Sequence, residues 1–124
     1  MNTLRIAPTK TSMEVFCEPE SGKLSFVGRS LPENSVGFFK PVLEWMIEYA
    51  THPAKNTEVT FYIEYCNSAS RKGVIDIFRI LDAMHDNGHA VSIVWKFDDG
   101  DESMREIGEE YRDLFSLDFK FTTI

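Results

Sequence analysis

Apolar and polar residues alternate in two short runs near the start of the chain, from Ser12 to Phe16 and from Lys23 to Val27. Such alternation is typical of half-buried strands, and the Ser21-Gly22 pair between the runs favours a turn. Pro19 ends the first strand because it has no amide hydrogen to donate. The pattern predicts a β-hairpin, preceded by a loose or frayed polar segment at residues 1–11.

A helical periodicity follows, in which apolar residues recur three and four positions apart. They are Phe38, Phe39, Val42, Leu43, Met46, Tyr49 and Ala50. Asn34 or Ser35 suits the N-cap of this helix. If the helix begins near Asn34, Pro41 lies in its interior and deletes one backbone hydrogen bond. If the regular helix begins near Lys40, Pro41 is harmless in its first turn. The sequence leaves both starts open, and His52-Pro53 ends the helix.

Strands and helices alternate through the rest of the chain. Residues Thr57–Cys66 are rich in β-branched and aromatic side chains and form the strongest predicted strand. A polar elbow, Asn67–Ser70, leads into a second helical stripe that ends at Asn87-Gly88. A strand from Ala90 to Phe97 then precedes a short helix, which Asp101 can cap.

The last helix extends to about Leu114, and a final strand covers Phe119–Thr123. The predicted order is therefore β-β-α-β-α-β-α-β. Helices that alternate with strands imply crossover connections and a largely parallel sheet. We expect one α/β domain over residues 1–124, with a mixed, mostly parallel sheet of about five strands and three helices.

Charge and composition narrow the class of protein. The net charge is -7 and the pI about 4.9, which argues against nucleic-acid binding and against docking on anionic membranes. The chain shows no signal peptide and no apolar run of membrane-spanning length. Cys17 and Cys66 fit no metal-binding spacing and are expected to be reduced and buried. A cytoplasmic protein follows from these features.

Three loops are expected to share one edge of the sheet, because the carboxyl ends of parallel strands lie together and sites form there. They are Leu31–Ser35, Asn67–Ser70 and Asp98–Asp101. The acidic loop offers an alternative function, a small metal-dependent enzyme using Asp98, Asp99 and Asp101. The loop lacks the alternating spacing of an EF-hand, and Asp101 is already useful as a cap.

No catalytic constellation stands out elsewhere. His85 and His89 are four residues apart, but a pair of solvated histidines explains them better than a metal site. Neither serine of the elbow has a GxSxG context, and the glycines form no phosphate loop. The sequence predicts no enzyme activity, no catalytic residue and no cofactor.

The elbow holds the most informative hydroxyl groups. Ser70 is placed to cap the second helix, which leaves Ser68 free. Arg71 and Lys72 open that helix, where the helix dipole disfavours cations. A phosphate on Ser68 would bring negative charge to these cations and to free amide groups.

These residues carry a resemblance. The order of elements, with a hydroxyl between the third strand and the second helix, is similar to STAS domains, and the chain resembles the SiaC family of regulatory phosphoproteins more closely. The matching segments span about residues 12 to 121. They are Pro32–Ser35, Asn67–Ser70, Asp76-Ile77, Val91-Ser92 leading to Trp95, and Glu109–Arg112.

The resemblance implies a partner-switching protein. Ser68 would be phosphorylated by a cognate serine/threonine kinase and dephosphorylated by a PP2C-like phosphatase. The unmodified form would bind and activate a partner, a diguanylate cyclase, in c-di-GMP signalling and biofilm regulation. The acceptor is Ser rather than the Thr expected of the family, and Ala69 replaces a second hydroxyl.

The predicted partner-binding surface combines the elbow, the second helix and the loop before the first helix. Its residues are Glu33, Asn34, Asn67, Ser70, Arg71 and Lys72. A further alternative is a constitutive structural subunit, which would bind its partner whether or not Ser68 carries phosphate.

Overall fold

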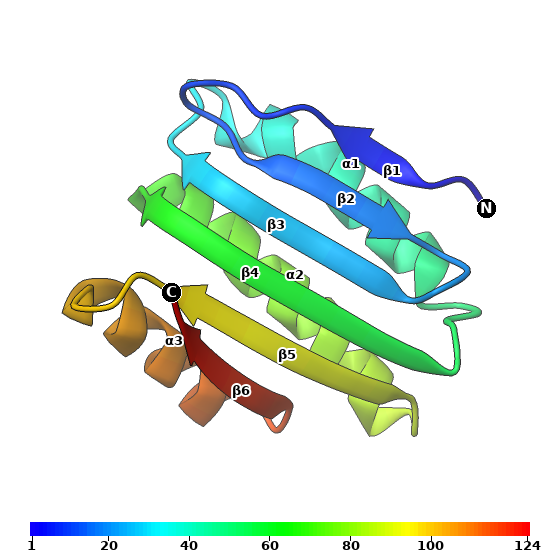
Figure 1. Cartoon of the computed structure of the whole chain (residues 1–124). Helices are drawn as coiled ribbons and strands as arrows, with labels where there is room; N and C mark the ends of the chain where they lie inside the picture. The colour runs from blue at the N-terminus through cyan, green and yellow to red at the C-terminus, as the bar shows by residue number, and fades with distance from the viewer.

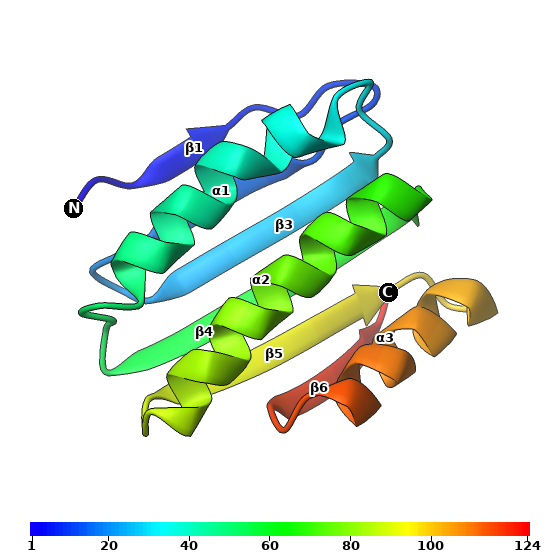
Figure 2. The same ribbon diagram turned by 180° about the vertical axis from the view of Figure 1, so that it is seen from behind.

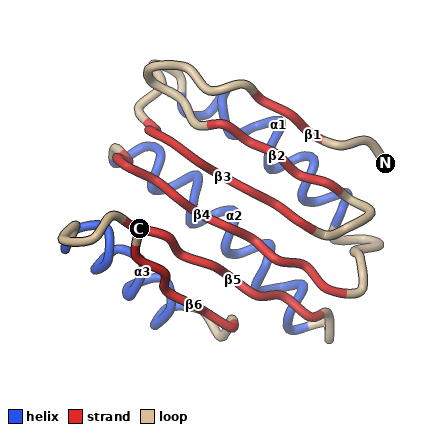
Figure 3. Tube along the Cα trace, in the orientation of Figure 1, coloured by secondary structure: helices blue, strands red, loops and turns tan.

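One face of a six-stranded sheet carries all three helices in the computed structural model, which describes residues 1–124 (Figures 1 and 2). The strands are β1 (Leu4–Ile6), β2 (Glu14–Glu18), β3 (Lys23–Ser30), β4 (Asn56–Cys66), β5 (Ala90–Phe97) and β6 (Asp118–Thr123). The helices are α1 (Ser35–Tyr49), α2 (Ser68–Asp86) and α3 (Glu102–Leu114). Figure 3 shows that the connections gather at the two ends of the strands.

The strands lie side by side in chain order, from β1 at one edge to β6 at the other. The β1–β2 and β2–β3 pairs are antiparallel, and the three remaining pairs are parallel. Each parallel connection carries one helix, as a crossover requires. The predicted α/β class and the order from β2 onward are confirmed, whereas the sheet has six strands rather than about five.

The additional strand, β1, lies within residues 1–11, where we expected a loose segment. It pairs with β2, and the Arg5 guanidinium lies 4.5 Å from the centre of the Phe16 ring. The Trp45 indole Nε1 of α1 donates a hydrogen bond of 2.8 Å to the Asn2 carbonyl. Contacts with distant residues, rather than a strong local pattern, hold this segment in the sheet.

The core lies between the sheet and the helix layer, and alternation along the strands places it there. In β4, Val59 and Phe61 are fully buried, while Glu58 on the opposite face is exposed. The Phe61 ring stacks on Phe26 of β3 at 5.1 Å and on Phe78 of α2 at 5.0 Å between centroids. This aromatic stack fixes the height of α2 above the centre of the sheet.

Helix α1 begins at Ser35 and contains Pro41 in its interior, which decides between the two starts left open by the sequence. The Asn34 side chain caps it by accepting a hydrogen bond of 3.0 Å from the Gly37 amide. A good cap offsets part of the cost of the hydrogen bond that Pro41 removes.

Both cysteines are free thiols. Cys17 is buried as expected, and burial raises its pKa to about 12. Cys66 is only partly buried, because β4 ends there and the chain turns into α2. None of the three helices combines the length and apolar character needed to cross a membrane.

Candidate functional site at the start of helix α2

The carboxyl ends of β3, β4 and β5 lie side by side at one end of the strands, since these strands are parallel neighbours (Figure 1). The three predicted loops therefore lie together at this end of the sheet. The Asn67 amide donates a hydrogen bond of 3.0 Å to the Ser30 carbonyl, which ties the elbow to the end of β3. In the third loop, Asp98 accepts a hydrogen bond from the Tyr62 hydroxyl, and this raises the pKa of Tyr62.

Asn67, and not Ser70, is the N-cap of α2. The Asn67 Oδ1 accepts a hydrogen bond of 2.8 Å from the Ser70 amide, and the Asn67 carbonyl accepts one of 2.9 Å from the Arg71 amide. The predicted cap at Ser70 is wrong because the helix begins directly after β4. Ser70 is fully buried instead, and its Oγ accepts a hydrogen bond of 2.8 Å from the Ser30 hydroxyl. It presents no surface to a partner.

Ser68 is the first residue of α2, and its side chain is exposed. A helix begins with four amides that have no intrahelical partner. Two of the four, those of Asn67 and Ser70, have partners already. The amides of Ser68 and Ala69 are the remaining two, so the Ser68 hydroxyl lies at the positive end of the helix dipole.

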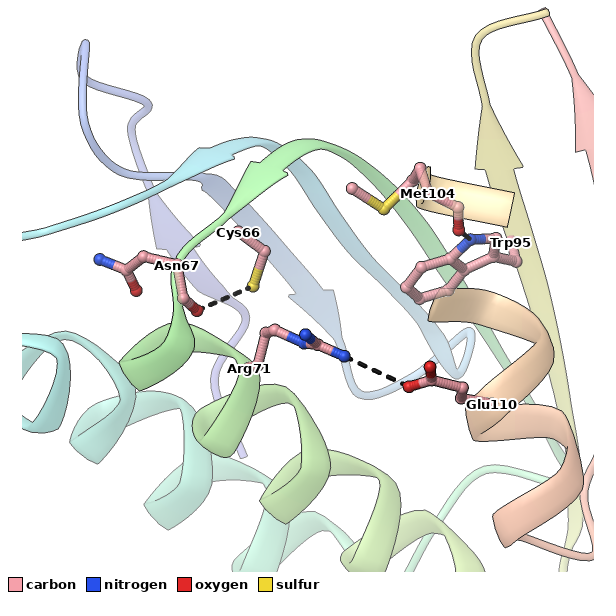
Figure 4. Close-up of polar contacts among 6 residues, drawn as sticks. All are labelled: Cys66, Asn67, Arg71, Trp95, Met104 and Glu110. Carbon is pink, nitrogen blue, oxygen red and sulfur yellow. Dashed lines mark hydrogen bonds and ion pairs between the residues drawn. The ribbon is translucent and has the colours of Figure 1, made fainter. Parts of the chain in front are cut away.

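Both cations that follow already have carboxylate partners. The Arg71 Nη2 lies 3.3 Å from the Glu110 Oε2 of α3 (Figure 4), and the Lys72 Nζ lies 3.2 Å from the Asp76 Oδ2. The sequence argument treated these cations as open to an incoming anion. Their pairs are exposed, and exposed pairs contribute only about 0.2–1 kcal/mol, so an anion of higher charge can compete for them.

Arg71 also lies near two ionisable groups, the buried Tyr111 and the partly buried Cys66. Burial raises the pKa of the Tyr111 phenol to about 12, and a hydrogen bond from Arg71 offsets part of this rise. Burial likewise raises the pKa of the Cys66 thiol to about 11 against the opposing charge of Arg71. The Cys66 Sγ contacts the Asn67 carbonyl at 3.7 Å (Figure 4). A thiol with a raised pKa is protonated at neutral pH, and the protonated form is a poor nucleophile.

A groove of about 350 Å³ runs between α1 and α2 beside this elbow. Its lining residues are Ser35, Val36, Phe39, Lys40, Leu43, Glu44, Ile47, Ala69, Lys72, Gly73 and Asp76. Val36 is 81% exposed and Ile47 60% exposed. Ala69, the neighbour of Ser68, lines the groove, so the candidate hydroxyl lies close to one end of it.

Sequence reasoning missed this groove. The groove forms only when α1 and α2 lie side by side, which the sequence does not show. A local signal of an exposed apolar surface existed, because Val36 and Ile47 are apolar residues outside the buried stripe of α1. Of the predicted surface residues, Glu33 and Asn34 are exposed just before α1, and Lys72 lines the groove itself.

The acidic loop and the histidines form no comparable site. The Asp101 Oδ1 accepts a hydrogen bond of 3.1 Å from the Met104 amide, which confirms its predicted role as a cap. No three His, Cys, Asp or Glu side chains in the structure converge as metal ligands. His85 and His89 line a polar depression at the opposite end of the strands, away from the elbow.

Comparison with known proteins connects this geometry to a family. A family model described as SiaC family regulatory phosphoprotein matches residues 6–124. An uncharacterised protein of Pseudomonas aeruginosa (strain UCBPP-PA14) is 31% identical over 119 residues, which cover 96% of this chain and 94% of the relative. Among solved structures, apo-SiaC from Pseudomonas aeruginosa superposes with a TM-score of 0.91 at 30% identity, covering 98% of this chain and 99% of that chain.

A second solved structure includes a partner. It is the crystal structure of the diguanylate cyclase SiaD in complex with its activator SiaC, also from Pseudomonas aeruginosa. The matching chain in that structure gives a TM-score of 0.93 at 30% identity, with 98% of this chain and 99% of that chain covered.

Proposed function

Because the chain belongs to the SiaC family of regulatory phosphoproteins, we propose that it is a switch protein controlled by phosphorylation of Ser68. In this proposal a serine/threonine kinase modifies Ser68 and a PP2C-like phosphatase removes the phosphate. The unmodified form binds and activates a diguanylate cyclase, and the chain itself catalyses no reaction. The exposed hydroxyl at the start of α2, next to an apolar groove, is the observation that carries the proposal.

Exposure and hydrogen bonding single out Ser68 among the hydroxyl groups of the elbow. A kinase needs a hydroxyl that can enter its active site. Ser70 is fully buried and accepts a hydrogen bond from Ser30. Asn67 caps the helix, so the Ser68 side chain has no capping duty. Ser68 is therefore free to be modified without loss of the cap.

The groove supplies the partner surface in this proposal. Val36 and Ile47 expose apolar side chains along it, and full burial of one such side chain contributes about 1.5–3 kcal/mol. An apolar segment of a cyclase would gain this energy. The relative SiaC is described as the activator of the cyclase SiaD, and we extend that class of partner to this chain.

Phosphorylation would weaken such a complex through charge and hydration. A phosphate adds about -1.5 to -2 charges at neutral pH. It would stand beside Ala69 at the end of the groove, and a partner segment docked there would have to displace its water. A loss of about 3 kcal/mol weakens binding more than a hundredfold.

The proposal is tested with phosphoserine inserted at position 68 during translation, which needs no kinase. A diguanylate cyclase from the same organism is titrated with the modified and unmodified chains, and c-di-GMP synthesis is followed. We expect activation by the unmodified chain only, with binding of the modified chain at least about a hundredfold weaker.

Phosphoserine at position 103 is the matched control. Ser103 is exposed in the first turn of α3, so it carries the same charge in a similar helical position away from the groove. Equal binding by the chains modified at positions 68 and 103 would contradict the proposal. In cells that contain the kinase, mass spectrometry should find phosphate on the wild type and none on Ser68→Ala.

A further inference from the structure

Ser68 lies between two cations on the surface of α2. Side chains three and four residues apart on a helix are neighbours. Arg71 is three residues after Ser68 and reaches toward α3, whereas Lys72 is four residues after it and lines the groove beside α1. A phosphate on Ser68 therefore has one cation on each side.

The two cations differ in what they hold. Of the five ion pairs in the structure, only Arg71–Glu110 joins two helices. Figure 4 shows the Arg71 side chain extending from α2 to Glu110 on α3. Arg71 also lies close enough to the Tyr111 phenol to lower the pKa of that group. The pair between Lys72 and Asp76, by contrast, lies within α2.

We propose that Arg71 senses the phosphate: modification of Ser68 draws the Arg71 guanidinium away from Glu110 and so loosens α3 from α2. This inference rests on the proposed modification of Ser68. In this proposal Arg71 is a positioning residue. It transmits the modification of Ser68 to α3, a helix that does not line the groove.

The competition between the phosphate and Glu110 favours the phosphate on two grounds. The side chains of Arg71 and Glu110 are 41% and 62% exposed, so solvent screens their attraction. A phosphate carries more charge than a carboxylate, and it can accept two parallel hydrogen bonds from a guanidinium, whereas Glu110 accepts a single one from Arg71. Lysine is a point charge without this fork, so Arg71 is the better phosphate ligand of the two cations.

Release of Glu110 would affect α3 unevenly. The first half of α3 is held to the sheet independently, because the Trp95 indole donates a hydrogen bond of 3.0 Å to the Met104 carbonyl. Gly108 packs directly against the Trp95 ring. The last turn of α3, Glu110–Leu114, loses its ion pair to α2 and keeps the packing of Tyr111 on the Phe78 ring, 4.8 Å between centroids. We expect its amides to exchange about twofold to fivefold faster after modification, and those of the first half to be unchanged.

The test follows the phosphate directly by ³¹P nuclear magnetic resonance, in full chains that carry phosphoserine at position 68. The second pKa of a phosphoserine is about 6, and a neighbouring cation lowers it. We expect Arg71→Gln to raise this pKa by about half a pH unit, and Lys72→Gln to raise it less. Glu110→Gln should lower it, because the competing carboxylate is gone.

Glu106→Gln is the matched control, since Glu106 is exposed on α3 and makes no ion pair. It should leave the phosphate titration unchanged. An unchanged pKa in Arg71→Gln, or a larger change in Lys72→Gln, would overturn the role of Arg71. Cyclase binding that stays sensitive to phosphate would then leave the Ser68 switch standing. Conversely, a modified chain that still bound the cyclase would refute the switch, while the titration would still decide whether Arg71 pairs with the phosphate.

Discussion

Helices α2 and α3 begin with the same capping hydrogen bond but differ in the charge of the cap and of the first turn. In each, the side chain of the residue before the helix accepts a hydrogen bond from an amide three residues on: Asn67 from Ser70 at 2.8 Å, and Asp101 from Met104 at 3.1 Å. The cap of α3 is a carboxylate, and Glu102 follows it in the first turn. Helix α2 has an amide cap and no acidic residue in its first turn.

The difference between the two helices lies in charge and not in hydrogen bonding. The N-terminal end of a helix favours negative charge. Helix α3 has this charge permanently, from Asp101 and Glu102. Helix α2 has Ser68 at the corresponding end, with Arg71 and Lys72 three and four residues later. A phosphate on Ser68 would thus supply to α2, reversibly, what the sequence of α3 already contains.

The largest predicted effect concerns how the two helices pack. Each contains a glycine against an aromatic ring, with an added Cβ 2.5 Å from Phe39 at Gly73 and 2.5 Å from Trp95 at Gly108. Overpacking costs about 1–3 kcal/mol. We expect Gly108→Ala to lower the free energy of unfolding by about 2 kcal/mol and Gly73→Ala by about 1 kcal/mol, measured by urea denaturation.

The order of these two losses follows from the neighbouring rings. Trp95 is fixed by its hydrogen bond to the Met104 carbonyl, whereas Phe39 lines the groove and can move into it. Phe39→Leu should therefore relieve most of the cost of Gly73→Ala. Equal losses for the two glycine variants would contradict this order, and a lack of relief by Phe39→Leu would show that the Phe39 ring is not the source of the cost at Gly73.

An effect of intermediate size on stability is expected at alkaline pH. It comes from Tyr111 on the buried side of α3, and not from the charged residues at the start of that helix. Burial raises the pKa of Tyr111 from 10 to about 12, so the folded state keeps the phenol proton longer than the unfolded state. The resulting stability is fully present below pH 10 and is lost as pH rises through 12. We expect Tyr111 to account for a loss of about 2 kcal/mol over this range.

Denaturation series between pH 9 and 12 measure this loss. Tyr111→Phe should show a shallower decline than the wild type, although Cys17 and Cys66, whose pKa values are also raised, keep part of the slope. Tyr65→Phe is the control, because that side chain is 50% exposed. A slope in Tyr111→Phe that equals the wild-type slope would argue against the burial of the phenol.

The smallest predicted effect exchanges the charges of the two caps. Asn67→Asp should stabilise the chain, and Asp101→Asn should destabilise it, each by about 0.3–1 kcal/mol at low salt. Thermal unfolding in low and high salt measures both changes, which should shrink as salt screens them. A gain in Asn67→Asp that persisted in high salt would point to hydrogen bonding instead of charge.

Local sequence patterns predicted most helices and strands. The details of the site were harder to predict, because they depend on contacts between residues far apart in the sequence. The cap at Asp101 was predicted locally, because Asp101 is the last residue of the acidic loop before the helix. At the elbow, Asn67 and Ser70 have similar capping propensities. The choice between them depends on Ser30, forty positions away from Ser70, which takes that hydroxyl into the core.

The same limit applies to strand β1 and to Arg71. Three residues of β1 carry too short a pattern to predict a strand, and its contacts come from Phe16 and α1. Arg71 was predicted to await an anion, because the sequence does not show that Glu110 lies within 3.3 Å. Ser68 is exposed, but its choice as the phosphorylated residue came from the family resemblance and stays a prediction.

The chain-order arrangement of the sheet has a consequence for synthesis on the ribosome. Every strand pairs with the strand made just before it, and none has to insert between two others. Domains fold from their N-terminal part as the chain emerges, and contacts between consecutive elements form fastest. We expect the sheet to grow by one strand at a time, with β6 closing it only after residue 123 has left the exit tunnel. Until then the outer edge of β5 exposes unpaired backbone amides, which another chain can pair with.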